Sequence, residues 1–218
     1  MSMTFNSVTF NPGRRALLSG FGGMVCASAF ITGAFATEPA SPAYVELDGH
    51  MKPLEFRMED VETGKTITEA AFRGHPVILY FGFTRCPDQC PLTMQNAARL
   101  VRMLGADGQK LRVAFVTVDL DHVTPARLKA FMAKFGKSPI FTGLRGTPAE
   151  LKAAAKRYGV FYKAPSGPNS PDPVSAVGHS DATYLFAPDG KAVAVMTALP
   201  TGRPDLAKDA ALIRKLIG

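Results

Sequence analysis

The chain contains no tryptophan, only three cysteines and only four histidines among its 218 residues. Its formal net charge is +7, from 25 basic and 18 acidic residues, but this excess is spread along the sequence and forms no basic stripe. Nucleic-acid-binding proteins typically gather their basic residues on one face or along one helix. The composition therefore argues against a nucleic-acid partner, and the sequence contains no internal repeat.

The first 36 residues have the pattern of an export signal. Arg14 and Arg15 precede an uncharged run, 16–35, that is rich in alanine, glycine, leucine and phenylalanine. The run ends in Ala34-Phe35-Ala36, a small-residue cleavage site. Because adjacent arginines also resemble a twin-arginine signal, both the Sec and the Tat routes stay open. We predict that residues 1–36 direct the chain out of the cytoplasm.

Removal of this segment leaves about 180 residues, enough for one domain with a sizeable core. We expect residues 37–50 to be a tether and residues 51–218 to form the domain. The apolar run is also just long enough for an uncleaved anchor, since a membrane span needs about 20 residues. Membrane association through residues 14–36 is therefore the alternative. Either way the domain lies in or faces the periplasm, where free thiols do not usually persist.

Hydrophobic patterns predict an alternation of strands and helices. The apolar run 77–83 is too short for a helix and is typical of a central parallel strand. The other expected elements are a hairpin at 55–65, helices at 92–104, 124–135, 147–158 and 204–217, strands at 111–118, 140–142, 183–186 and 192–195, and an exposed proline-rich loop at 164–175.

Strands that alternate with helices are parallel when the crossovers are right-handed. The turn Pro188-Asp189-Gly190 adds an antiparallel hairpin. We therefore predict an α/β, thioredoxin-like fold, with a mixed central sheet, helices on both faces and β-hairpin additions.

The most informative motif is Cys86-Pro87-Asp88-Gln89-Cys90, which directly follows the predicted strand 77–83. Ligand sites in such sheets lie at the carboxyl ends of the strands. Since Cys26 lies inside the predicted signal, Cys86 and Cys90 are the one thiol pair of the exported chain. Three roles are open: a structural disulfide, a redox dithiol, or two ligands of a metal site. A disulfide that closes so short a loop would add little stability through loop entropy.

Pro87 suits the first turn of a helix. If the helix begins there, Cys86 and Cys90 share one face, with Cβ atoms about 5–6 Å apart. That separation suits two sulfurs bound to one metal, although a disulfide is also within reach. A helix N-terminus lowers the pKa of a nearby thiol, which serves both metal binding and thiol exchange. Dithiol oxidoreductases usually have two residues between their cysteines and this motif has three, so a metal site is favoured.

A histidine would complete such a site. His50 lies near the tether and His75 precedes the core strand. His122 follows the strand 111–118, and His179 lies just before the strand 183–186. Both are placed near the edge that carries the cysteines, and spacing alone does not separate them.

Several segments resemble the Sco/SenC family of copper proteins. Residues 81–91, FGFTRCPDQCP, are similar to the family signature F-G-Y-T-H-C-P-D-x-C-P. Segments 116–119, 141–147 and 178–186 resemble further motifs of the family, in the same order. The resemblance covers roughly residues 51–218 and implies a thioredoxin-like fold. It also implies one copper ion, Cu(I) or Cu(II), bound by Cys86, Cys90 and His179.

The function that this resemblance implies is assembly of the binuclear copper centre of cytochrome c oxidase, by delivering copper, by reducing the target's cysteines, or both. The implied partners are the copper-site subunit of the oxidase and an upstream periplasmic copper donor. The ligand chemistry agrees, because thiolates select Cu(I) and imidazole also suits Cu(II).

Two residues depart from the family pattern. Arg85 stands where the family usually has histidine; one role open to it is to offset the charge of the thiolates, but we expect it to be a solvent-facing loop residue. Gly178 replaces an acidic residue before the implied ligand His179, which would weaken the support of that ligand.

We therefore predict a copper metallochaperone rather than a turnover enzyme. The alternative is a thiol-disulfide oxidoreductase that reduces the cysteines of the oxidase copper site. In that case Cys86 is the nucleophile, because it is nearer the helix start, and His179 is dispensable. A third hypothesis, a peroxidase on the same fold, requires a sulfenic acid at Cys86.

Overall fold

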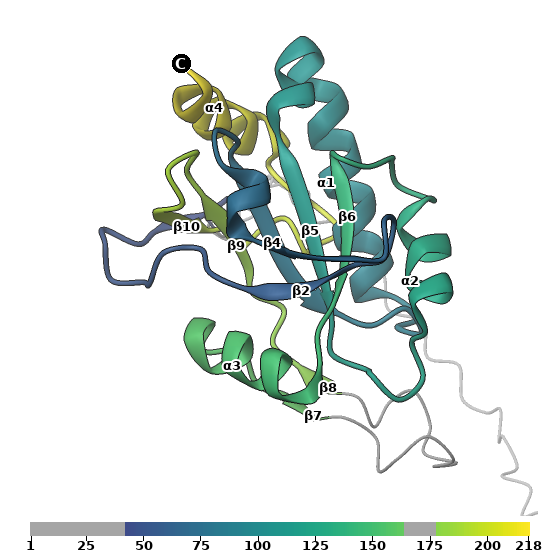
Figure 1. The fold of residues 1–218 in the computed structure, drawn as a ribbon. Helices are drawn as coiled ribbons and strands as arrows, with labels where there is room; N and C mark the ends of the chain where they lie inside the picture. The colour runs from purple at the N-terminus through teal and green to yellow at the C-terminus, as the bar shows by residue number, and fades with distance from the viewer. Residues whose placement is uncertain (1–41, 164–177) are drawn as a thin grey trace, which may run out of the picture. The chain divides into compact units, whose positions relative to one another are not determined.

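The computed structural model describes residues 42–163 and 178–218, which belong to one compact unit (Figure 1). In this part of the chain an eight-stranded sheet has the order β1-β10-β9-β4-β5-β6-β2-β3. Its strands are β1 (Val45–Glu46), β2 (Arg57–Asp60), β3 (Lys65–Thr68), β4 (Val77–Gly82), β5 (Arg112–Thr117), β6 (Phe141–Arg145), β9 (Thr183–Phe186) and β10 (Ala192–Val195).

Helices and a small ribbon complete the described part. The α-helices are α1 (Gln89–Leu104), α2 (Pro125–Met132), α3 (Pro148–Tyr158) and α4 (Leu206–Ile217), and the 3-10 helices are η1 (Glu69–Phe72) and η2 (Gly105–Lys110). The strands β7 (Tyr162–Lys163) and β8 (Gly178–His179) pair with each other, outside the main sheet.

The centre of the sheet is parallel. β4 pairs with β5, and β5 with β6, in parallel register. All six residues of β4 and all six of β5 are buried. Continuous apolar runs are what parallel strands require, because both of their faces are covered. The predicted central strand is therefore confirmed.

Ring contacts show that helices cover both faces of the sheet. On one face the ring of Tyr80 lies 5.8 Å from that of Phe115, which lies 5.3 Å from Phe131 of α2. The next residue of β4, Phe81, instead contacts Tyr158 of α3, at 6.1 Å between ring centroids. Successive side chains of a strand point to opposite faces, so α2 and α3 cover opposite faces, as predicted.

Antiparallel strands extend the sheet at both edges. β9 pairs with β4, and β10 returns beside β9. At the other edge the hairpin of β2 and β3 attaches to β6. The predicted hairpin additions are confirmed.

Two predicted segments lie outside the described residues: the export segment 1–36 and the proline-rich loop 164–175. β1 lies within the stretch expected to be a tether and pairs with β10. Among the helices of the described residues, none has the length and apolar character needed to cross a membrane.

Candidate metal centre

The two cysteines lie on the loop that joins β4 to α1. The helix begins at Gln89, with Asp88 as its N-cap at φ −136° and ψ −71°. The helix thus begins two residues after Pro87, the start considered for it from the sequence, and three residues before the predicted range 92–104. Cys86 precedes the helix, and Cys90 lies in the first helical turn. The physical reason is that the loop curls around the sulfur of Cys86, so Asp88 has no helical conformation.

The curled loop still brings the two sulfurs together. The backbone N–H of Cys90 donates a hydrogen bond to Cys86 Sγ, at 3.4 Å. Cys86 is partly exposed and Cys90 is fully buried, and both are reduced, with no disulfide between them. Solvent or a partner protein can therefore reach the sulfur of Cys86 but not the sulfur of Cys90.

The environments of the two thiols move their pKa values apart. The pKa of Cys86 is lowered to about 5, first by a hydrogen bond from the Cys90 thiol and then by the backbone N–H groups of Cys90, Asp88 and Gln89, against the opposing effect of burial. The pKa of Cys90 is raised, first by that hydrogen bond to Cys86 and then by burial. At neutral pH the pair therefore holds one thiolate and one thiol, and a bound metal would displace the remaining proton.

Asp119, just after β5, ties this loop to the neighbouring strand end. Arg85 Nη2 lies 3.0 Å from Asp119 Oδ2, and Asp119 is fully buried. Arg85 is partly exposed, but it does not simply face solvent as predicted: it pairs with Asp119, because a buried carboxylate requires a charged or hydrogen-bonding partner. The other oxygen, Oδ1, lies 2.8 Å from His122 Nδ1. Asp119 thus holds both Arg85 and His122.

His179 is placed at the same end of the sheet as the cysteines. Its backbone lies in β8 opposite Tyr162. β9 begins four residues later, and its Thr183 pairs with Tyr80 near the carboxyl end of β4. The side chain of His179 lies outside what the structure describes, so its role as a ligand stays a prediction.

His75 and His50 are not brought to the cysteines. His75 Nδ1 contacts the carbonyl of Lys110 at 2.8 Å, before the start of β4, and His50 follows β1. Among the side chains that the structure describes, no group of three or more histidine, cysteine and acidic residues is arranged to hold a metal ion. Of the three predicted ligands, the side chains of Cys86 and Cys90 are described, and they lie together.

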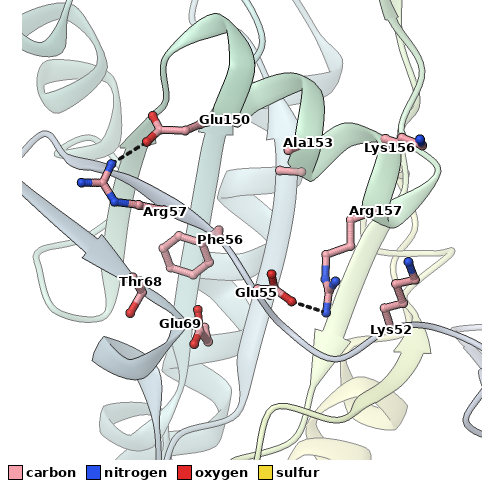
Figure 2. A pocket seen from close by; sticks show the side chains of 11 residues that line it. Lys52, Glu55, Phe56, Arg57, Thr68, Glu69, Glu150, Ala153, Lys156 and Arg157 are labelled. Carbon is pink, nitrogen blue, oxygen red and sulfur yellow. Dashed lines mark hydrogen bonds and ion pairs between the residues drawn. The ribbon is translucent and has the colours of Figure 1, made fainter.

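A surface pocket of about 710 Å³ lies elsewhere, between α3 and the segment from residue 52 to η1. Figure 2 shows two ion pairs in its wall, Arg57 with Glu150 and Arg157 with Glu55, at 2.8 and 2.7 Å. No residue of the loop between β4 and α1 lines this pocket. It is therefore separate from the candidate metal centre.

A family model described as SCO1/SenC matches residues 52–214. The chain belongs to the SCO1/SenC family. The match includes the loop between β4 and α1 as well as β8, so it covers all three predicted ligands of this Sco/SenC chain.

Two relatives illustrate the similarity. Protein SenC of Rhodobacter capsulatus is 37% identical over 127 residues, which are 58% of this chain and 55% of the relative. The mitochondrial protein SCO2 homolog of Bos taurus is 37% identical over 129 residues, which are 58% of this chain and 47% of the relative. The chain thus spans about half the length of these curated relatives.

Solved structures agree with the family assignment. The copper-bound ScoI of Bradyrhizobium japonicum has a TM-score of 0.64 and 29% identity, covering 75% of this chain and 98% of that one. The copper-bound Sco1 of yeast has a TM-score of 0.65 and 30% identity, covering 75% and 89%. The predicted thioredoxin-like fold is confirmed.

Proposed function

We propose that this chain is a copper metallochaperone that binds one copper ion through Cys86, Cys90 and His179 and helps to assemble the binuclear copper centre of cytochrome c oxidase. The observation that carries the proposal is the pair of sulfurs held together at the carboxyl end of β4, in a chain similar to proteins solved with copper bound. Soft thiolate ligands select Cu(I), and an added imidazole also accommodates Cu(II).

The geometry suits a cargo that must be handed on. Cys86 is partly exposed, so a partner can approach its sulfur, while the buried Cys90 holds the other side. The partners in this proposal are the copper-site subunit of the oxidase, as recipient, and a periplasmic copper donor. The location is the periplasm or its membrane face, reached through the export signal or anchor of residues 1–36.

The first experiment is an anaerobic Cu(I) titration of the reduced protein against a competing chelator. One tight equivalent is expected. Cys90→Ser and His179→Ala should each weaken copper binding by at least about tenfold. Loss of a residue that only supports a ligand typically costs that much, so loss of a ligand should cost at least as much. His50→Ala is the matched control, because His50 lies away from the cysteines, and it should bind as the unchanged protein does. Weak binding by the unchanged protein would contradict the proposal.

A second candidate function, thiol-disulfide exchange with the oxidase cysteines, is favoured by the unequal pKa values of the pair. A thiolate at Cys86 and a thiol at Cys90 are the forms that a nucleophile and a resolving cysteine need. In this case Cys86→Ser abolishes exchange with a disulfide-bonded peptide of the recipient, and His179→Ala exchanges at the unchanged rate. Weak copper binding together with this pattern would assign the reductase function.

A further inference from the structure

A tyrosine of β4 lies directly against the buried cysteine. The hydroxyl of Tyr80 donates a hydrogen bond to Cys90 Sγ, at 3.6 Å between oxygen and sulfur. Both side chains have 0% of their surface exposed. Tyr80 and Cys90 therefore face each other across the interface between the sheet and α1, with no water-accessible surface on either.

Close packing holds this hydrogen bond in place. Gly82 lies on the same face of β4 as Tyr80, two residues along. A Cβ atom at Gly82 would stand 2.8 Å from Tyr80 Cε1, 2.9 Å from Cys90 Sγ and 3.0 Å from Phe115 Cζ. Real Cβ atoms essentially never approach below 3.0 Å, so the rings of Tyr80 and Phe115 and the sulfur of Cys90 leave no room for a side chain at position 82. The absence of a side chain at Gly82 therefore lets the Tyr80 ring and the Cys90 sulfur pack beside each other.

Hydrogen bonds to a ligand sulfur change what that sulfur gives to a metal. A donor withdraws electron density from the thiolate and so tunes the redox potential of a copper–thiolate site. Cu(II) depends more on electron donation from sulfur than Cu(I) does, so a donor at the sulfur favours Cu(I).

We propose that Tyr80 is a positioning residue of the copper centre, which orients Cys90 Sγ and shifts the preference of the site toward Cu(I). This inference rests on the proposed function for its copper chemistry. The hydrogen bond itself and its effect on the thiol pair can be measured without metal.

The test uses Tyr80→Phe, which removes one oxygen and keeps the ring. Its matched control is Tyr184→Phe. Tyr184 is also buried and also loses one donated hydrogen bond, at 2.8 Å to the carbonyl of Tyr158. It pairs with Leu79, the neighbour of Tyr80 in β4, and therefore faces the opposite side of the sheet.

The affinities for Cu(I) and Cu(II) are measured in both variants by chelator competition, together with the sulfur-to-Cu(II) charge-transfer absorption. Tyr80→Phe should lower the ratio of Cu(I) to Cu(II) affinity by about tenfold, the effect expected of a hydrogen bond to a charged group. It should also move the absorption to longer wavelength. Tyr184→Phe should leave both unchanged, while its urea midpoint falls as much as that of Tyr80→Phe.

The outcomes separate the two proposals. If the unchanged protein binds copper through its cysteines and Tyr80→Phe alters neither the ratio nor the absorption, the inference on Tyr80 is wrong and the proposed function stands. If the unchanged protein binds no copper, the proposed function is wrong.

In that case the effect of Tyr80 on the Cys86–Cys90 pair is tested without metal, on the thiol-disulfide equilibrium with glutathione. In that reaction two glutathione thiols become one glutathione disulfide while the Cys86–Cys90 disulfide gains two electrons and two protons. Tyr80→Phe should lower the equilibrium constant for reduction several-fold, because the reduced sulfur loses its donor. An unchanged constant would overturn the inference.

Discussion

Two cysteines of identical chemistry differ here because their surroundings differ. Cys86 lies on a loop whose backbone N–H groups point at its sulfur. Cys90 is buried between α1 and the sheet, beside Tyr80. The motif alone predicts that the pair lies at a helix start. The motif cannot predict which sulfur is buried, because the burial of Cys90 depends on its packing against Gly82 and Tyr80. In the sequence these two residues are part of an ordinary buried strand.

The unequal thiols predict the pH dependence of alkylation. Since the pKa of Cys86 is lowered to about 5, its reaction with iodoacetamide should be half-maximal near that pH and flat from pH 7 to 9. Cys90→Ala removes the largest cause of the shift, so the midpoint should move upward, toward the usual thiol value of about 8.5. Mass spectrometry of the labelled protein measures both. A midpoint near 8.5 in the unchanged protein would contradict this assignment.

Arg85 leads to a prediction about stability. Arg85→Met leaves the buried carboxylate of Asp119 with His122 alone, and should cost about 2 kcal/mol of the free energy of unfolding, below the range for a fully buried pair because Arg85 is partly exposed. Urea denaturation measures the change. Lys152→Met, at an exposed position of α3, is the control and should change stability by less than about 0.5 kcal/mol. Equal midpoints for the two variants would show that the ion pair contributes nothing.

At the scale of elements, hydrophobic patterns predict the α-helices and the longer strands well. The order of strands and α-helices is as expected, apart from the strands β1, β7 and β8. Each of these has two residues, too few to show a period, and each forms only because a partner segment lies beside it. α1 begins at Gln89, between the conditional start at Pro87 and the predicted range 92–104, because the loop wraps the sulfur of Cys86.

The cap of α3 provides a test at this scale. The Thr147 hydroxyl accepts from the N–H of Glu150, whose carboxylate accepts in return from the N–H of Thr147, at 3.3 and 2.8 Å. Thr147→Ala should therefore lower the free energy of unfolding by about 1 kcal/mol, whereas Thr147→Ser, which keeps the hydroxyl, should lose much less. Thermal denaturation followed by circular dichroism compares them. Equal losses in the two variants would mean that the cap does not stabilise α3.

At the scale of the whole molecule, stability should depend on pH through Asp209 of α4. This carboxyl is fully buried, and neither of its oxygens has a hydrogen-bond partner among the described residues. Its pKa is raised to about 7, first by burial and then by the charge of Asp205. Because the folded pKa lies above the unfolded value of 3.8, folding loses stability as pH rises from about 4 to about 7.

Asp209→Asn removes this ionisation. The free energy of unfolding of this variant, relative to that of the unchanged protein, should be higher at pH 8 than at pH 5. The difference between the two pH values should be on the order of 3 kcal/mol. Urea midpoints at the two pH values measure the change. Asp205→Asn, at the helix cap, is the control for a charge lost nearby. A gain that is equal at pH 5 and pH 8 would show that Asp209 does not titrate between them.

The site as a whole joins segments far apart in the sequence. The sheet places the loop of Cys86 and Cys90, the end of β5 and the start of β9 at one edge, as predicted from the carboxyl ends of the strands. Spacing could not choose between His122 and His179. The structure shows that His122 is hydrogen-bonded through Nδ1 to Asp119, and His179 stays the proposed third ligand from the family resemblance.

The most direct test of this account is the copper K-edge X-ray absorption spectrum of the Cu(I)-loaded protein and of its His179→Ala variant. The account predicts two sulfur ligands and one nitrogen ligand in the unchanged protein, and two sulfurs without that nitrogen in the variant. A spectrum without two sulfurs would contradict the thiol pair as the copper site, and an identical spectrum in His179→Ala would remove His179 from it.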